Sequence, residues 1–178
     1  MLSENLQASL QKVLEYPVIS RIRRNHGLEH AVMHILSKRY PDLPMAGYSM
    51  PSGFRLMGDV PTEALQEAVE EALLRMRAGE ENLAVHPNCG TNFVTAGTLA
   101  GLAGATAMMG VGKRKSERLE RLALAAVLAT MALIVAQPLA LALQRDITTS
   151  GKPGALAVYE IRCLQRGRMT LHQVITRG

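Results

Sequence analysis

Three histidines of this 178-residue chain are spaced four residues apart, at His26, His30 and His34. In an α-helix, residues at this spacing lie about 40° apart around the axis and therefore share one face. Two imidazoles at positions i and i+4 can both reach one Zn²⁺ ion, with bonds of about 2.0–2.1 Å. The row therefore predicts a metal site, with a solvated polar face as the alternative.

Glu29 directly precedes His30, so residues 26–30 have the pattern H-x-x-E-H. Its carboxylate flanks the same edge of the helix as the two imidazoles, where it can polarise a water molecule as a general base. The pattern resembles that of the inverted zincins, which are metallopeptidases defined by H-x-x-E-H. This resemblance implies that His26 and His30 bind zinc and that Glu29 is the catalytic base.

The third zinc ligand has to come from another part of the chain. Inverted zincins take it from a glutamate on a later helix, but the glutamates of the next predicted helix lie opposite its apolar stripe and are expected in solvent. We therefore rank His86 first, then His34, which extends the row, then Cys89, which can bind metal as a thiolate. Imidazole ligands also suit iron, nickel and copper.

The loop after His86 permits two other interpretations. His86 and Cys89 could act as the base and the nucleophile of a thiol enzyme, with a nearby Asn amide orienting the base. Alternatively, Pro87 and Gly90 only turn the chain into the next segment. The sequence leaves both open beside the metal site.

The elements that position these residues follow from apolar spacing and turn residues. A short amphipathic helix is predicted over 3–14, where Leu6, Leu10 and Leu14 share one stripe. Pro17 suits the first turn of a second helix, which ends at about Arg39. The further predicted elements are a hairpin over 45–57 with its turn at 51–53, a helix over about 61–78, and short strands at 83–85, 145–149, 155–163 and 169–175.

Two uncharged segments, Phe93–Val111 and Leu122–Leu143, are each about long enough to cross a hydrocarbon core of roughly 30 Å as a helix. The connection between them, residues 112–121, carries five basic and two acidic side chains, as is common beside a membrane. Together they predict a transmembrane helical hairpin. Within it, Gly97 and Gly101 form a G-x-x-x-G pair, which predicts close packing against the second helix or against another protomer of a homo-oligomer.

The expected fold class is an α+β membrane protein in three parts. A small N-terminal soluble domain of helices and a hairpin (1–92) carries the histidine helix, a two-helix hairpin (93–143) crosses the membrane, and a β-rich C-terminal segment (144–178) follows. We expect a two-pass protein of the bacterial cell membrane. Cytoplasmic termini are favoured because the first residues contain no apolar signal region that would export a folded segment.

The composition excludes other classes. The chain has 20 Lys and Arg residues against 15 Asp and Glu, no Trp and only two cysteines. The basic excess lies beside the apolar segments instead of on a face with stacking aromatics, so nucleic acid is not an expected partner. Two cysteines cannot build a disulfide framework.

Three motifs, Asn25–His34, Gly58–Pro61 and Leu83–Asn92, together resemble an uncharacterised bacterial family of two-pass membrane proteins, known as a domain of unknown function. The resemblance implies a membrane protein and brings no activity with it. Two hypotheses follow. One is a membrane-tethered zinc metallopeptidase that hydrolyses peptide bonds of a membrane-proximal protein or peptide, which Glu29 favours. The other is a non-catalytic membrane protein with a structural metal site or a partner-binding histidine cluster, which the missing glutamate ligand favours.

Overall fold

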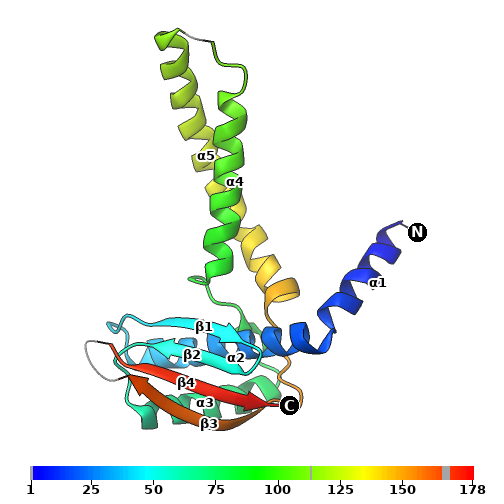
Figure 1. The fold of residues 1–178 in the computed structure, drawn as a ribbon, viewed down its shortest axis with the longest axis vertical. Coiled ribbons are helices and arrows are strands. Elements are labelled where there is room, and N and C mark those ends of the chain that lie inside the picture. The colour runs from blue at the N-terminus through cyan, green and yellow to red at the C-terminus, as the bar shows by residue number, and fades with distance from the viewer. Residues whose placement is uncertain (1, 113, 166–168) are drawn as a thin grey trace. The chain divides into compact units, whose positions relative to one another are not determined.

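The computed structural model describes residues 2–112, 114–165 and 169–178. The chain forms two compact units (Figure 1). The first unit joins residues 1–86 to residues 145–178, and the second is the segment between them. The predicted N-terminal and C-terminal parts therefore share one unit.

Three α-helices of the first unit correspond to the predicted helices: α1 (Leu2–Leu14), α2 (Pro17–Arg39) and α3 (Thr62–Arg77). Pro17 occupies the first turn of α2, where the N–H that proline lacks would have no partner within the helix. After α3, Gly79 adopts a φ of 97°, a left-handed conformation that glycine tolerates and that ends the helix. The three helical predictions are confirmed.

Four antiparallel strands form one sheet in the order β1-β2-β4-β3. Their bounds are Ala46–Met50 for β1, Gly53–Met57 for β2, Ala157–Gln165 for β3 and Leu171–Arg177 for β4. The first two strands are the predicted hairpin. β4 pairs with β2, with Val174 opposite Phe54, so the C-terminal strands complete the sheet that the N-terminal hairpin begins.

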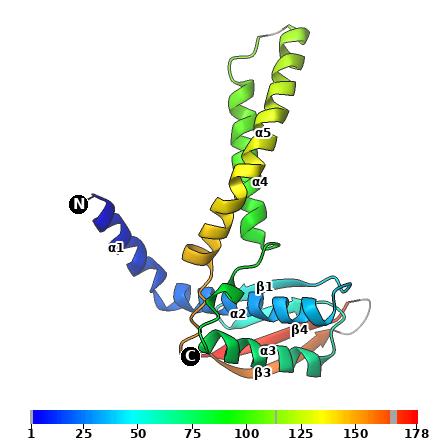
Figure 2. The same ribbon diagram turned by 180° about the vertical axis from the view of Figure 1, so that it is seen from behind.

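Figure 2 shows α2 and α3 against one face of this sheet. The sheet contributes Phe54, Leu56 and Val174 to the core, and α2 contributes Leu28 and Leu36; all five side chains are fully buried. Burying one such side chain stabilises the fold by about 1.5–3 kcal/mol. This layer therefore fixes the apolar face of α2, and with it the direction of the opposite, histidine-bearing face.

Two predicted strands are wrong. In place of the strands expected at 83–85 and 145–149, the structure has two short helical turns: η1 of 3₁₀ type (Glu81–Ala84) and η2 of π type (Gln144–Thr148). The Arg23 side chain of α2 explains part of the second change, because its Nε donates to the carbonyl of Ile147 at 2.7 Å. A side chain thus pairs with a backbone group that a neighbouring strand would otherwise use.

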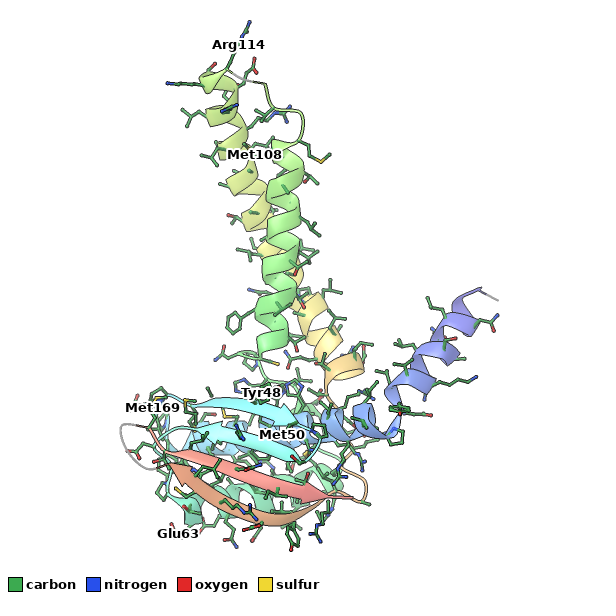
Figure 3. The ribbon with its side chains drawn as sticks, in the orientation of Figure 1. Tyr48, Met50, Glu63, Met108, Arg114 and Met169 are labelled. Carbon is green, nitrogen blue, oxygen red and sulfur yellow. The ribbon has the colours of Figure 1, made fainter. Side chains whose placement is uncertain are left out.

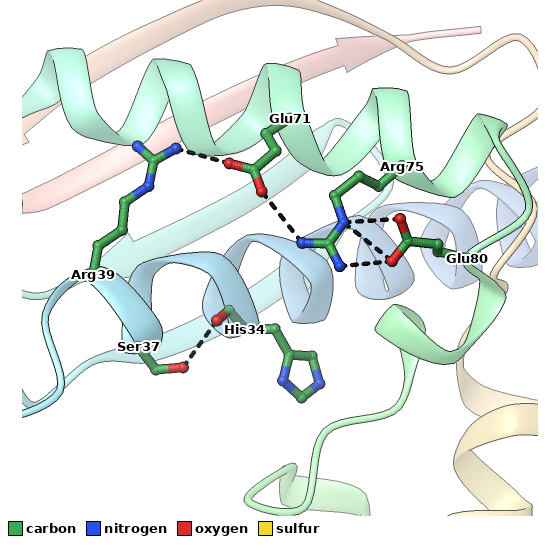
Figure 4. A network of polar contacts seen from close by, with 6 residues as sticks. All are labelled: His34, Ser37, Arg39, Glu71, Arg75 and Glu80. Carbon is green, nitrogen blue, oxygen red and sulfur yellow. Dashed lines mark hydrogen bonds and ion pairs between the residues drawn. The ribbon is translucent and has the colours of Figure 1, made fainter.

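Ion pairs link the solvent-facing sides of α2 and α3 (Figure 4). Arg39 contacts Glu71 at 2.8 Å, and Glu71 also contacts Arg75 at 3.2 Å. Arg75 pairs with Glu80 at 2.6 Å, and this guanidinium lowers the pKa of the Glu80 carboxyl. The carboxylates of this group serve exposed ion pairs, which agrees with the expectation that the glutamates of α3 lie in solvent.

The second unit consists of α4 (Gly90–Met108) and α5 (Lys115–Leu143), which pack along each other. In Figure 3, Met108 and Arg114 mark the connection between them, and side chains project outward along both helices. The buried hydrophobic residues of the two helices are all alanines: Ala107, Ala125, Ala136 and Ala140. Large apolar side chains are more than half exposed instead, among them Phe93, Val94, Leu102, Met131, Ile134 and Val135.

Among the described residues, one helical segment, Lys115–Thr148, is long and apolar enough to cross a membrane. The prediction of a second span, over Phe93–Val111, is not supported by this finding. The difference has a local reason, because α4 includes the polar Thr91 and Asn92 in its first turn and ends at Met108, before the uncharged segment does. The helical hairpin itself is present.

The glycines of α4 are not part of its contact with α5. A Cβ atom built at Gly97 or Gly101 would meet no described atom within 4 Å, apart from the backbone of its own helix. The prediction that this G-x-x-x-G pair packs against the second helix is therefore wrong. Packing against another protomer stays a prediction.

Candidate metal centre

His26 and His30 lie side by side on α2, as their spacing predicts. Their ring centroids are 4.4 Å apart, and a ring nitrogen of one lies within 4.8 Å of a ring nitrogen of the other. A tetrahedral zinc ion with bonds of about 2.0–2.1 Å needs its two nitrogens about 3.3 Å apart. Small side-chain rotations would therefore bring both nitrogens onto one ion.

Hydrogen bonds to backbone carbonyls define the protonation of both rings. His26 Nδ1 lies 2.9 Å from the carbonyl oxygen of Thr148, and His30 Nδ1 lies 2.7 Å from that of Ala84. A carbonyl oxygen can only accept, so each Nδ1 carries the hydrogen, and in the neutral ring the lone pair is on Nε2. Histidines that bind metals are commonly oriented in this way, with one ring nitrogen donating to a carbonyl and the other facing the ion.

His34 has the opposite arrangement. Its Nε2, not its Nδ1, lies 2.8 Å from a backbone carbonyl, that of Val85. In its neutral form His34 therefore carries the lone pair on Nδ1. The bond also fixes the backbone directly before His86, so His34 helps to place its neighbour.

The structure brings His86 beside the histidine row. Its ring centroid is 5.7 Å from that of His30 and 4.8 Å from that of His34. Burial, together with the nearby His34 and His30, lowers the pKa of His86 to about 4. The ring is therefore neutral at pH 7, which is the form that binds metal. Three predicted ligands, His26, His30 and His86, thus belong to one cluster of the first unit.

Glu29 is buried, with 5% of its surface exposed, and its carboxylate lies against β1. Ser49 of β1 donates a hydrogen bond to Glu29 Oε2. The other oxygen, Oε1, occupies space beside Gly47, where a Cβ atom would lie only 2.1 Å away. The predicted base is therefore held by a strand that the sequence did not connect with it.

A close approach of two backbone segments brings the Thr148 carbonyl to His26. A Cβ atom at Gly27 would lie 2.1 Å from the carbonyl oxygen of Ser150, so only glycine lets the C-terminal segment run this close to α2. Ser150 in turn donates its backbone N–H to the carbonyl of Arg23. This contact places the neighbouring Thr148 carbonyl at His26.

Sequence reasoning missed Ser49, Gly47 and Gly27. One signal was present, because Gly47 and Ser49 are two residues apart in a predicted strand and hence face the same side. Two small residues on one side of a strand leave room for a larger side chain from a neighbouring element. The identity of that side chain, Glu29, depends on long-range packing.

Cys89 belongs to the second unit and begins α4, where its Sγ accepts a hydrogen bond from the backbone N–H of Thr91 at 3.4 Å. A cysteine can bind a metal ion as a thiolate, so Cys89 as the third ligand stays a prediction.

Comparison with known proteins places the chain in a family. Residues 21–161 match a family described as a domain of unknown function, DUF6391. Over 116 residues, 60% of this chain, it is 40% identical to an uncharacterized protein of Picosynechococcus sp., and the match spans 57% of that protein's length. No solved structure matches significantly. Because the matched residues make up most of the chain, including most of α2, His86 and both helices of the second unit, this protein belongs to the DUF6391 family.

Proposed function

We propose that this chain is a membrane-anchored zinc hydrolase that cleaves peptide bonds of a membrane-proximal protein or peptide. The observation that best supports the proposal is the pair of carbonyl hydrogen bonds at His26 and His30. They set both rings, four residues apart on one helix, in the tautomer whose Nε2 can bind a metal ion. A solvated polar face requires neither a buried His30 ring nor hydrogen bonds that fix the tautomers of both rings.

His26, His30 and His86 would hold the ion. Three imidazoles form a common catalytic zinc set, which leaves a fourth position for water or substrate. His86 suits this role because it lies beside His30 and is neutral at pH 7. His34 and Cys89 are the alternative third ligands, His34 through its Nδ1 and Cys89 as a thiolate.

Glu29 would provide the acid–base chemistry. When bound, zinc supplies a Lewis acid that polarises the carbonyl of the scissile bond. The Glu29 carboxylate would take a proton from the attacking water and pass it to the leaving amine. The hydrogen bond from Ser49 would hold the carboxylate in one orientation between these steps.

The second unit would anchor the protein in the bacterial cell membrane. α5 meets the length and composition of a spanning helix, and apolar side chains on the outside of both α4 and α5 are exposed. A bilayer would cover these side chains. We therefore propose that α4 passes through the bilayer beside α5, which makes substrates near the membrane surface the most accessible ones.

One observation favours the alternative of a non-catalytic metal site. Both oxygens of Glu29 lie against β1, one at Ser49 and the other at Gly47. In that alternative, the carboxylate orients the metal-bearing helix and takes no part in catalysis. The two functions differ in what Glu29 does, so this residue separates them.

The test is Glu29→Gln in the full chain, offered a pool of membrane-associated peptides with and without a chelator. If Glu29 is the catalytic base, the variant should keep its metal and hydrolyse peptides about 10²–10⁴-fold more slowly. Glu63→Gln, on the exposed face of α3, is the matched control and should cleave like the wild type. Cleavage that survives Glu29→Gln or the chelator would exclude the mechanism, and a metal-loaded wild type without activity would support the non-catalytic alternative.

A further inference from the structure

The N-terminal helix α1 carries an apolar stripe that faces solvent. Leu6 is 71% exposed, Leu10 42% and Val13 54%. At about 100° per residue, these three side chains lie within about 60° of one another around the axis. Just beyond the helix, Tyr16 and Val18 are also exposed.

A helix of this kind needs a partner. α1 has 13 residues, and isolated helices shorter than about 12–15 residues are marginal in water. Most helical stability in proteins comes from packing of the apolar face. The core of the first unit includes no residue of α1, so the described part of that unit leaves this face uncovered.

We infer that α1 is an interfacial helix, lying on a phospholipid bilayer with Leu6, Leu10 and Val13 among the upper acyl chains. The inference rests on the membrane anchoring proposed above. If α5 spans a bilayer, the same bilayer is tethered to α1, and binding becomes an intramolecular step at high effective concentration. Tyr16 then lies at the end of the stripe, where amphipathic rings favour the headgroup level.

The few charges of α1 indicate that it would bind a bilayer through the apolar acyl chains and not through anionic headgroups. Lys12 is the one basic residue of α1, and Glu4 is the one acidic residue. A helix that selects anionic lipids usually has many more Lys and Arg residues on its polar face. A second copy is the less suitable occupant, because three apolar residues over less than two heptads make a very short coiled coil.

The chain contains no Trp, so a single introduced Trp reports its own surroundings. We would compare Leu10→Trp on the apolar stripe with Gln11→Trp, its neighbour on the polar side, in the full chain. Both proteins go into nanodiscs of phosphatidylcholine brominated on the acyl chains, because bromine quenches indole fluorescence on contact. Ile134→Trp, exposed on α5, reports whether the anchor is embedded.

We expect several-fold stronger quenching for Leu10→Trp than for Gln11→Trp, together with strong quenching for Ile134→Trp. Equal quenching of the two α1 variants would overturn the inference. A blue-shifted but unquenched Leu10→Trp would also overturn it, since protein would then cover the stripe. If Ile134→Trp is quenched and Leu10→Trp is not, the anchor stands and only the interfacial helix fails; an unquenched Ile134→Trp contradicts both.

Discussion

The two units of this chain bury opposite kinds of side chain. The first unit encloses large apolar residues such as Phe54 and Leu28, as proteins in water do. The second unit encloses alanines between α4 and α5 and exposes its large side chains, including Ile134. The contrast teaches that the first unit is stabilised by removing large apolar side chains from water, whereas the second unit leaves such side chains on its outside.

The largest expected effect is a difference in stability between a truncation in the first unit and a matching truncation in the second. Leu28→Ala should destabilise the first unit by about 2–5 kcal/mol, because it removes buried contacts and leaves a cavity. Ile134→Ala should change the stability of the helical hairpin in detergent by less than about 0.5 kcal/mol, since its side chain packs against little protein.

Denaturant titration measures both variants. All four tyrosines lie in the first unit, so tyrosine fluorescence follows that unit alone, and far-ultraviolet circular dichroism follows the helices. A loss for Ile134→Ala as large as that for Leu28→Ala would contradict the contrast between the units.

The next effect concerns the buried carboxylate. Ser49→Ala should destabilise the first unit by about 1.5–3 kcal/mol, because it removes the hydrogen bond to the Glu29 carboxylate. Ser49→Thr, which keeps a hydroxyl group, should retain most of that stability. The same fluorescence titration would measure both, and equal losses for the two variants would show that the hydroxyl is not the stabilising group.

A pair of substitutions, one on each helix, tests which residues form the contact between α4 and α5. Ala125→Leu enlarges a buried residue of the hairpin and should cost about 1–3 kcal/mol in detergent. Gly101→Leu should change stability by less than about 0.5 kcal/mol, because its Cβ would enter open space. If circular dichroism and cross-linking showed that Gly101→Leu separates the two helices, the glycine face of α4 would be the interface.

The last effect is the pH dependence that His86 imparts to the metal-free protein. Its pKa of about 4 in the folded chain lies below the unfolded value of 6.5, so the unfolded chain takes up a proton first as the pH falls. The stability present above pH 6.5 should decline between about pH 6.5 and about pH 4. Unfolding midpoints measured with a chelator should fall less in His86→Gln; an identical fall would assign the effect to other groups.

Local patterns in the sequence predicted the local elements well. The row of His26 and His30, the turn between β1 and β2, and the proline that begins α2 all depend on residues near each other along the chain. Pairing of β4 with β2 could not be predicted in this way, since it joins residues more than 100 positions apart. For the same reason the sequence placed Glu29 at the edge of the histidine row and missed its contact with Ser49.

The two apolar segments show another limit of prediction from the sequence. Both lack charges, but the ends of each helix decide how many consecutive apolar residues it contains. α4 ends at Met108 and so falls short, whereas α5 continues to Leu143. His86 was predicted as third ligand because it is the one histidine left between α2 and the apolar segments, and the structure places its ring beside those of His30 and His34.

The metal content of the purified full chain tests the central claim most directly. We predict one divalent metal ion per chain for the wild type and loss of that ion in both His26→Ala and His30→Ala, since each removes one of the two Nε2 ligands. His86→Ala should weaken binding more than His34→Ala, and His34→Gln, which can still donate to the Val85 carbonyl, is the control expected to keep the metal. Stoichiometric metal in both His26→Ala and His30→Ala would contradict the account.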